Sequence, residues 1–158
     1  MTERTSLIMF DHPNNEPVLK LTEDQSWKLL EGTQHGRLVG VVAGRPDIFP
    51  INIAVRGGKV FFRTAPGTKL AEVAINDQVL IEADGILSDQ AWSVVVRGSA
   101  RLLQTSREIA SAESLNLRPW VPGPKEQFVE VTPTEVSGRH FEFGPYRDRD
   151  LGEGSETG

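Results

Sequence analysis

A short segment from Arg63 to Lys69 combines residue types that bind anions. It joins the end of an expected strand, a turn at Gly67 and the start of an expected helix at Thr68. Lys69 then stands in the first helical turn, where the helix dipole makes a positive charge unfavourable by up to about 1 kcal/mol. A phosphate held by backbone N–H groups, the Thr68 hydroxyl, Lys69 and Arg63 would remove this conflict. The alternative is a solvated surface, on which Lys69 extends into water, Arg63 pairs with a surface acid and Thr68 only caps the helix.

A second polar position lies in the expected strand over residues 48–55. Pro50 and Asn52 interrupt an otherwise apolar run. Proline within a strand indicates an edge strand or an unpaired position. Asn52 faces away from Ile51 and Ile53, so its amide would be offered to a ligand lying across the sheet. The alternative is that Asn52 simply faces solvent.

Metal and thiol chemistry have little support in the sequence. The chain has no cysteine, which excludes disulfides, thiolate metal sites, iron–sulfur clusters and cysteine nucleophiles. Its three histidines, His12, His35 and His140, lack the spacing of a zinc site. The sequence therefore predicts no metal site.

Other polar side chains carry weaker signals. Ser93 and Ser99 lack the G-x-S-x-G context of a serine hydrolase. Glu82 and Asp84 stand at the end of an expected strand and are expected to face solvent rather than to act as an acid pair. Trp120 lies in a proline-rich loop and is expected to pack against the sheet, although it could instead cover a ligand cleft.

Composition narrows the class of protein. The chain has 158 residues, with 17 Lys and Arg against 22 Asp and Glu, which gives a net charge of −5. This acidic balance argues against a nucleic-acid partner, because no global field attracts the phosphate backbone. The apolar runs are too short to span a membrane, and the apolar stretch near the N-terminus is too short for a signal peptide. Together with the absence of cysteine, these features favour a cytoplasmic protein.

The secondary structure expected around these residues consists mostly of short strands. Capping boxes at Thr22–Gln25 and Thr105–Glu108 predict helices that end near Gly32 and Ser114, and Thr68 predicts a third. Gly57-Gly58 predicts a tight hairpin, whereas residues 44–47 predict a turn. In the long strand, Trp92, Val94 and Val96 share one face, and Gly98 indicates a bulge or a close backbone approach. The expected strands are 38–42, 48–55, 59–64, 78–83, 91–103, 128–131 and 139–143.

This order of elements predicts a mainly β protein with short helices. Hairpin connections favour an antiparallel sheet, and six or seven strands suggest a closed or partly closed barrel. We expect an irregular N-terminal arm over residues 1–20, one domain over 21–143 and a disordered tail over 144–158. The arm could wrap a partner subunit through residues 7–10.

Five sequence blocks, in this order and spacing, are similar to a known family. The blocks are GRLVGVVAGRPDIFPINIAV, VFFRTAPGTKLA, VLIEADG, WSVVVRGSARLL and LRPWVPGPKEQFVEVTPTEVSGRHF. They resemble the short, single-domain bacterial members of the pyridoxamine 5′-phosphate oxidase-like, FMN-binding split-barrel proteins. The resemblance covers residues 20–143.

The resemblance implies a six- or seven-stranded antiparallel split barrel that forms a homodimer, with FMN in clefts between the subunits. Residues along the isoalloxazine ring would be Pro50, Ile51 and Asn52. The ribityl phosphate would be held by Arg63, Thr64, Thr68 and Lys69. The partner subunit would contribute from the strand that holds Trp92 and Ser93.

The implied function is an FMN-dependent oxidoreductase. It would pass electrons from NAD(P)H or a reduced small molecule to oxygen or a small organic acceptor. Because the cofactor carries the chemistry, no catalytic residue is assigned. One alternative is a non-catalytic flavin-binding or haem-binding protein. For haem, His35 is the best-placed axial ligand, and His12 and His140 are alternatives. Another is a nitroreductase-like or deazaflavin-dependent reductase, although relatives resembling nitroimidazole reductases often have histidine at the position of Arg63.

Overall fold

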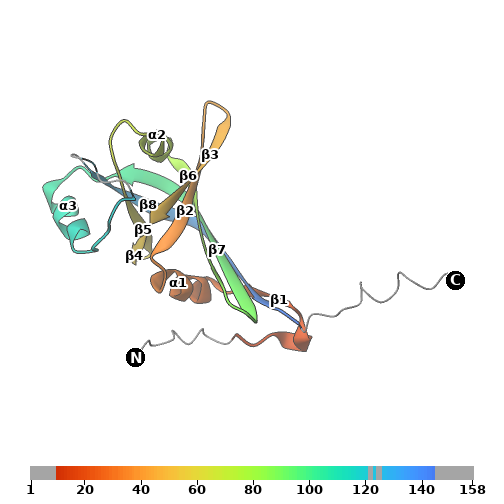
Figure 1. The fold of residues 1–158 in the computed structure, drawn as a ribbon. Coiled ribbons are helices and arrows are strands. Elements are labelled where there is room, and N and C mark those ends of the chain that lie inside the picture. Colours follow the sequence, from red (N-terminus) through yellow and green to blue (C-terminus); the bar gives the residue numbers. More distant parts are fainter. Residues whose placement is uncertain (1–9, 121–122, 124–125, 145–158) are drawn as a thin grey trace.

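The structure is a computed structural model that describes residues 10–120, 123 and 126–144. All but Gly144 of the predicted tail over residues 144–158, and all but Phe10 of the apolar stretch at residues 7–10, lie outside the described residues. Strands predominate, joined by three short α-helices and one 3-10 turn at Pro13–Asn15 (Figure 1). Within the described part of the chain, no helix is long and apolar enough to cross a membrane.

The strands form one antiparallel sheet that curls on itself. Its order is β3-β2-β6-β7-β8-β5-β4, and β1 pairs with the far end of β8. The two edge strands, β3 and β4, are separated in the chain only by Ile53, so the ends of the sheet must come together. The antiparallel split-barrel fold is therefore confirmed. The strands are β1 (Val18–Leu21), β2 (His35–Val42), β3 (Arg45–Asn52), β4 (Ala54–Arg56), β5 (Lys59–Thr64), β6 (Gln78–Ile86), β7 (Gln90–Leu102) and β8 (Gln127–Glu142).

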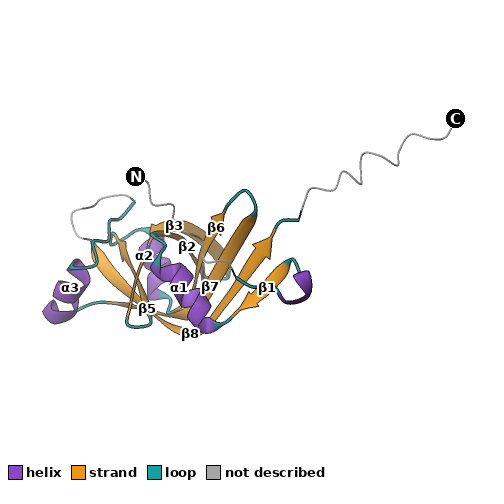
Figure 2. Cartoon of the chain, turned by 90° about the horizontal axis from the view of Figure 1, so that it is seen from below, coloured by secondary structure: helices purple, strands orange, loops and turns teal. Residues whose placement is uncertain are grey.

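Each α-helix begins at a predicted capping threonine. Thr22 and Thr105 form complete capping boxes with Gln25 and Glu108, and the Thr68 hydroxyl accepts a hydrogen bond from the backbone of Ala71. In Figure 2, α1 and α2 lie against the sheet, and α3 lies at the opposite end of the molecule from β1. The helices are α1 (Glu23–Glu31), α2 (Lys69–Ile75) and α3 (Ser106–Glu113).

The core fills the inside of the curl. Trp92, Val94 and Val96 lie on the buried face of β7, as their spacing predicts. Phe62 on β5 and Leu30 on α1 are completely buried. Burying each such apolar side chain contributes about 1.5–3 kcal/mol, so this core accounts for much of the stability that holds the site residues in place.

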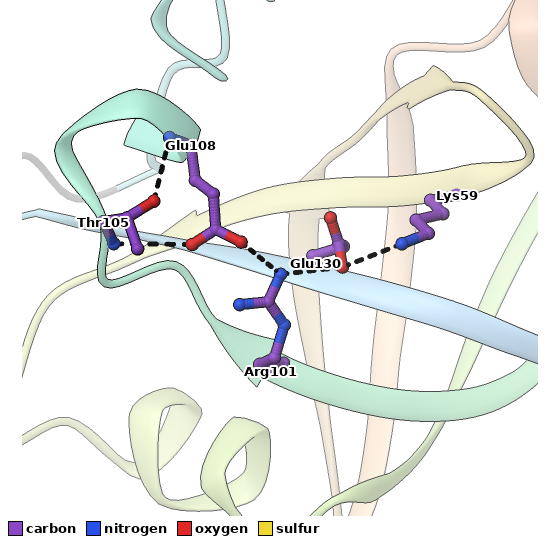
Figure 3. Close-up of polar contacts among 5 residues, drawn as sticks. All are labelled: Lys59, Arg101, Thr105, Glu108 and Glu130. Atoms are coloured by element: carbon purple, nitrogen blue, oxygen red, sulfur yellow. Dashed lines mark hydrogen bonds and ion pairs between the residues drawn. The ribbon is translucent and has the colours of Figure 1, made fainter. Parts of the chain in front are cut away.

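A polar cluster attaches α3 to the sheet (Figure 3). Arg101 on β7 donates hydrogen bonds to Glu108 at 2.7 Å and to Glu130 on β8 at 3.2 Å, and Glu130 also accepts from Lys59 at 3.2 Å. The Arg101 hydrogen bond, followed by the Thr105 contacts, lowers the pKa of Glu108 to about 2. Glu108 therefore both caps α3 and anchors its first turn.

The predicted irregularity at Gly98 is confirmed. The β7–β8 register shifts between Arg97 and Gly98, which leaves Thr134 as the extra residue on β8. A Cβ atom on Gly98 would overlap the carbonyl group of Thr132, so the backbones approach closely there. The bulge also accommodates Pro133, which lacks a donor for the ladder.

Several sequence-based boundaries are wrong. The expected strand over residues 48–55 is divided between β3 and β4 at Ile53, whose backbone N–H donates to the Gln34 carbonyl. The β2–β3 turn lies at Ala43-Gly44, both at positive φ, rather than at residues 44–47, because the edge strand β3 tolerates Pro46. The expected strands 128–131 and 139–143 are one strand, β8 (Gln127–Glu142), because the bulge absorbs Pro133. Part of the predicted irregular arm forms β1, which is too short to show periodicity and is stabilised by pairing with β8.

Candidate functional site

A cavity of about 340 Å³ lies between β3, β5 and the start of α2, and we call it the β3–β5 cavity. Seven of the nine predicted site residues line it. They come from three separate segments of the chain: Pro50, Ile51 and Asn52; Arg63 and Thr64; Thr68 and Lys69. The remaining lining residues are mostly apolar: Phe49, Ala65, Leu70, Pro119 and Trp120. An apolar cavity with a few convergent polar groups is typical of cofactor sites.

The Asn52 side chain is held in place by the protein. Its amide nitrogen donates to the carbonyl oxygen of Arg118 at 2.7 Å, and its amide oxygen accepts from Nδ1 of His35 at 3.0 Å. Asn52 is thus not simply solvent-facing. It connects the edge strand to the loop that carries Trp120, and it fixes the wall of the cavity.

Arg63 reaches from β5 toward the same loop. Its guanidinium lies 4.3 Å from the centre of the Phe128 ring, donates to the Leu117 carbonyl at 3.1 Å and approaches Glu126 at 3.3 Å. Arg63 therefore does pair with an acid, Glu126, but it also contacts Phe128 and the Leu117 carbonyl. However, its buried Nε has no hydrogen-bond partner among the described residues. A buried donor without a partner is costly, so an acceptor brought by a ligand would stabilise this arrangement.

At the start of α2, the threonines are hydrogen-bonded within the turn, whereas Lys69 is not. The Thr68 hydroxyl donates to the Ala65 carbonyl at 2.7 Å and accepts from Ala71 at 3.1 Å, so its proton is already used within the turn. Buried Thr64 lies 3.4 Å from it. Lys69 is exposed and makes no ion pair with the described residues. Lys69 is therefore the cation at this position that is available to an anion.

A wider groove of about 1180 Å³ adjoins the cavity, and it shares Asn52 and Arg63 with it. We call it the α1–α3 groove, because its walls come from the chain after α1, from residues 52–56 and from residues 113–118. Most of its lining residues are polar, including Gln34, Asn116 and Arg118. The two spaces together could accommodate a ligand larger than the cavity alone.

Trp120, Trp92 and Ser93 differ in their position relative to the cavity. Trp120 lines the cavity and is 59% exposed, so the expectation that it packs against the sheet is wrong. Its ring lies edge-on to His35, with centroids 6.3 Å apart. Trp92 is buried in the core, and Ser93 lies on β7 opposite Asp84 and Arg139. Neither Trp92 nor Ser93 lines the cavity of the same chain.

Glu82 and Asp84 match the expectation only in part, because Asp84 is exposed whereas Glu82 is half-buried. Glu82 and Asp84 on β6 both accept from Arg37 on β2, at 2.8 and 3.1 Å. Burial, followed by a hydrogen bond with Asp84, raises the pKa of Glu82. Antiparallel pairing of β2 with β6 brings these groups together, which the sequence alone did not reveal.

Two histidines meet at the other end of the sheet. His12 and His140 are 128 positions apart, yet their ring nitrogens lie 2.6 Å from each other. Burial, followed by the nearby charge of His12, lowers the pKa of His140. The sequence spacing contained no signal for this pair, because the pairing of β1 with β8 creates it.

Comparisons with known proteins agree with this architecture. The family model described as pyridoxamine 5′-phosphate oxidase matches residues 22–140. A solved structure described as the FAD binding protein from Mycobacterium smegmatis is 44% identical, covers 80% of this chain and all of that one, and superimposes with a TM-score of 0.73.

Two further relatives have no described function. A conserved protein of unknown function from Corynebacterium diphtheriae is 34% identical, with a TM-score of 0.68 and coverage of 80% of this chain and 99% of that one. An uncharacterized protein from Mycobacterium tuberculosis is 42% identical over 95 residues, which are 60% of this chain and 86% of the relative. The family match, the identity and the shared fold together assign this chain to the pyridoxamine 5′-phosphate oxidase-like family.

Proposed function

We propose that this protein binds a flavin nucleotide in the β3–β5 cavity. The observation that carries the proposal is the convergence of seven predicted residues from three chain segments on one cavity. Its volume, about 340 Å³, falls within the range of small-molecule sites, roughly 300–1,000 Å³. The 44% identical relative described as FAD binding supports the same ligand class.

The chemistry of the lining suggests the orientation of the ligand. The flat ring would lie against Pro50, Leu70 and Trp120, where apolar contact is available. A phosphoryl group would approach Lys69 and the Nε of Arg63, since these are the cationic donors of the cavity lining that have no partner among the described residues. Thr68 would contribute through its backbone position rather than through its hydroxyl proton.

The flavin nucleotide could be FMN or the larger FAD, and we favour FAD. The family resemblance implies FMN, which would need only the β3–β5 cavity. The polar α1–α3 groove adjoins the cavity at Asn52 and Arg63, and it offers space for the adenylate half of FAD. The relative described as FAD binding favours the same choice.

We further propose an oxidoreductase that works as a homodimer in the cytoplasm. A bound flavin supplies hydride and electron transfer, while the chain binds it, orients the ring and limits the access of water. A second copy would cover the exposed Trp120 side of the cavity and bring in Trp92 and Ser93, which lie outside the cavity of their own chain. Exposed Ile48, on the edge strand that lines the cavity, supports an apolar contact there.

The test begins with the purified full chain. We expect a flavin absorption spectrum, or saturable quenching of added FAD fluorescence, and mass analysis of the released cofactor would distinguish FAD from FMN. Anaerobic NADH or NADPH should bleach the flavin, and an acceptor should restore its colour. Flavin binding without bleaching by NADH or NADPH would favour a non-catalytic binding protein. Failure to bind either nucleotide would refute the proposed function.

A further inference from the structure

We propose that His12, His140 and Glu142 form a binding site for a transition-metal ion of the zinc class. His12 precedes β1, whereas His140 and Glu142 end β8, so the ion would link the two ends of the described chain. This site lies apart from the β3–β5 cavity and shares no lining residue with it. The proposal does not depend on flavin binding.

The three side chains are close and partly enclosed. One ligand atom from each residue lies within 4.8 Å of the others. The His12 side chain and His140 are each only 2% exposed, and the ring of Phe10 packs 5.0 Å from that of His140. Glu142, 3.8 Å from Nε2 of His12, is 48% exposed. Two enclosed imidazoles with a half-exposed carboxylate leave one side open for a water ligand.

The hydrogen bonds on the outer sides of the rings fix their tautomers. Nδ1 of His12 lies 2.6 Å from the carbonyl oxygen of Glu16, which can only accept, so Nδ1 carries a hydrogen. Nε2 of His140 likewise donates to the Gln90 amide oxygen at 2.8 Å. In neutral imidazoles, the remaining two nitrogens then hold lone pairs. These are Nε2 of His12 and Nδ1 of His140, which face each other at 2.6 Å.

Two facing lone pairs repel, so a cation must lie between them. A proton would make one enclosed ring an imidazolium. A metal ion uses both lone pairs as they stand, and Glu16 and Gln90 then serve as the outer hydrogen-bond partners that metal-bound histidines normally have. Zinc suits this set of two nitrogens and one carboxylate, with Zn–N distances of about 2.0–2.1 Å. Tetrahedral geometry requires the nitrogens to separate to about 3.4 Å, which a small displacement of the segment before β1 would allow.

The experiment uses the full chain, treated with chelator and then titrated with zinc chloride near neutral pH by calorimetry. We expect one zinc ion per chain, and no comparable binding of magnesium, which prefers oxygen ligands. His12→Gln should weaken zinc binding by more than about 100-fold, and Gln90→Leu, which removes only the outer partner of His140, by about 10–100-fold. His35→Gln is the matched control, because it removes a histidine outside the cluster and should leave zinc binding unchanged.

Two further measurements test the proposal even if His12→Gln or Gln90→Leu fails to fold. Glu142→Gln changes a half-exposed side chain and should fold normally while binding zinc more weakly. X-ray absorption of the zinc-loaded wild-type protein should show two imidazole nitrogens and no sulfur. Absence of stoichiometric zinc binding would overturn the proposal in favour of a shared proton. Unchanged affinity in His12→Gln and Glu142→Gln, or a single imidazole ligand, would overturn it as well.

Discussion

Lys69 offers the sharpest test of the proposed flavin site, because its contributions to stability and to binding should have opposite signs. It is exposed at the first position of α2 and forms no ion pair with the described residues. Arg63 is less suitable, since its replacement would also release Glu126 and the Leu117 carbonyl. Lys69→Ala therefore removes a charge without breaking a described contact.

The expected magnitudes follow from these surroundings. One charge-assisted hydrogen bond contributes about 1.5–3 kcal/mol, so Lys69→Ala should raise the Kd for flavin roughly 10- to 150-fold. The same substitution removes a positive charge from the positive end of α2 and introduces a good helix former. In the absence of flavin, the free energy of unfolding should therefore stay the same or rise by up to about 1 kcal/mol.

Flavin fluorescence titration would measure the affinity, and urea unfolding of the flavin-free protein would measure the stability. Lys28→Ala is the matched control, because this exposed lysine lies in the last turn of α1, where its charge is favourable. It should lower the stability slightly and leave flavin affinity unchanged. Equal flavin affinity in Lys69→Ala and the wild type would refute the role of Lys69. A marked loss of stability in Lys69→Ala would show that it has a structural role instead.

Three other predictions concern the fold and the assembly. The pKa of Glu108 is lowered to about 2, so its charged form stabilises the fold above its ordinary pKa, near 4.5, and this contribution is lost as the pH falls from 4.5 toward 2. Glu108→Gln should therefore lower Tm near neutral pH. The difference in Tm from the wild type should disappear between pH 4.5 and 2. A difference that is constant with pH would contradict the ion-pair explanation. Gly98→Ala should destabilise the protein by about 1–3 kcal/mol in urea unfolding, because the added methyl group overlaps the β8 backbone, whereas Gly32→Ala, with no atom closer than 3.8 Å, is its control. Light scattering at micromolar concentration should give the mass of a homodimer, and a monomer that still binds flavin would disprove the shared site.

Local sequence patterns predicted the elements whose stabilising contacts lie within a few residues. The capping boxes at Thr22 and Thr105 formed as expected, because each donor and acceptor are only three positions apart. Gly57-Gly58 formed its hairpin with both residues at positive φ, a conformation that other residues rarely adopt. The helix that starts at Thr68 depends on a similarly local bond.

The candidate site was only partly predictable in this way. The segment from Arg63 to Lys69 has a local conflict that indicates an anion. Its association with Pro50 and Asn52 came only from the family resemblance, because the distance between β3 and β5 depends on how the sheet curls. For the same reason, the cavity position of Trp120 was only the alternative to packing against the sheet, and the hydrogen bonds from Arg37 to Glu82 and Asp84 were missed.

Local residue patterns are thus sufficient for the helix starts, the tight turn and the alternation that places Val94 and Val96 inside. Three other features follow from the folded sheet: residues 18–21 join it, β8 continues through Pro133, and His12 meets His140. These outcomes depend on pairing between strands far apart in the chain. The energy of such pairing comes from the register and packing of the whole sheet, which no short window of sequence contains.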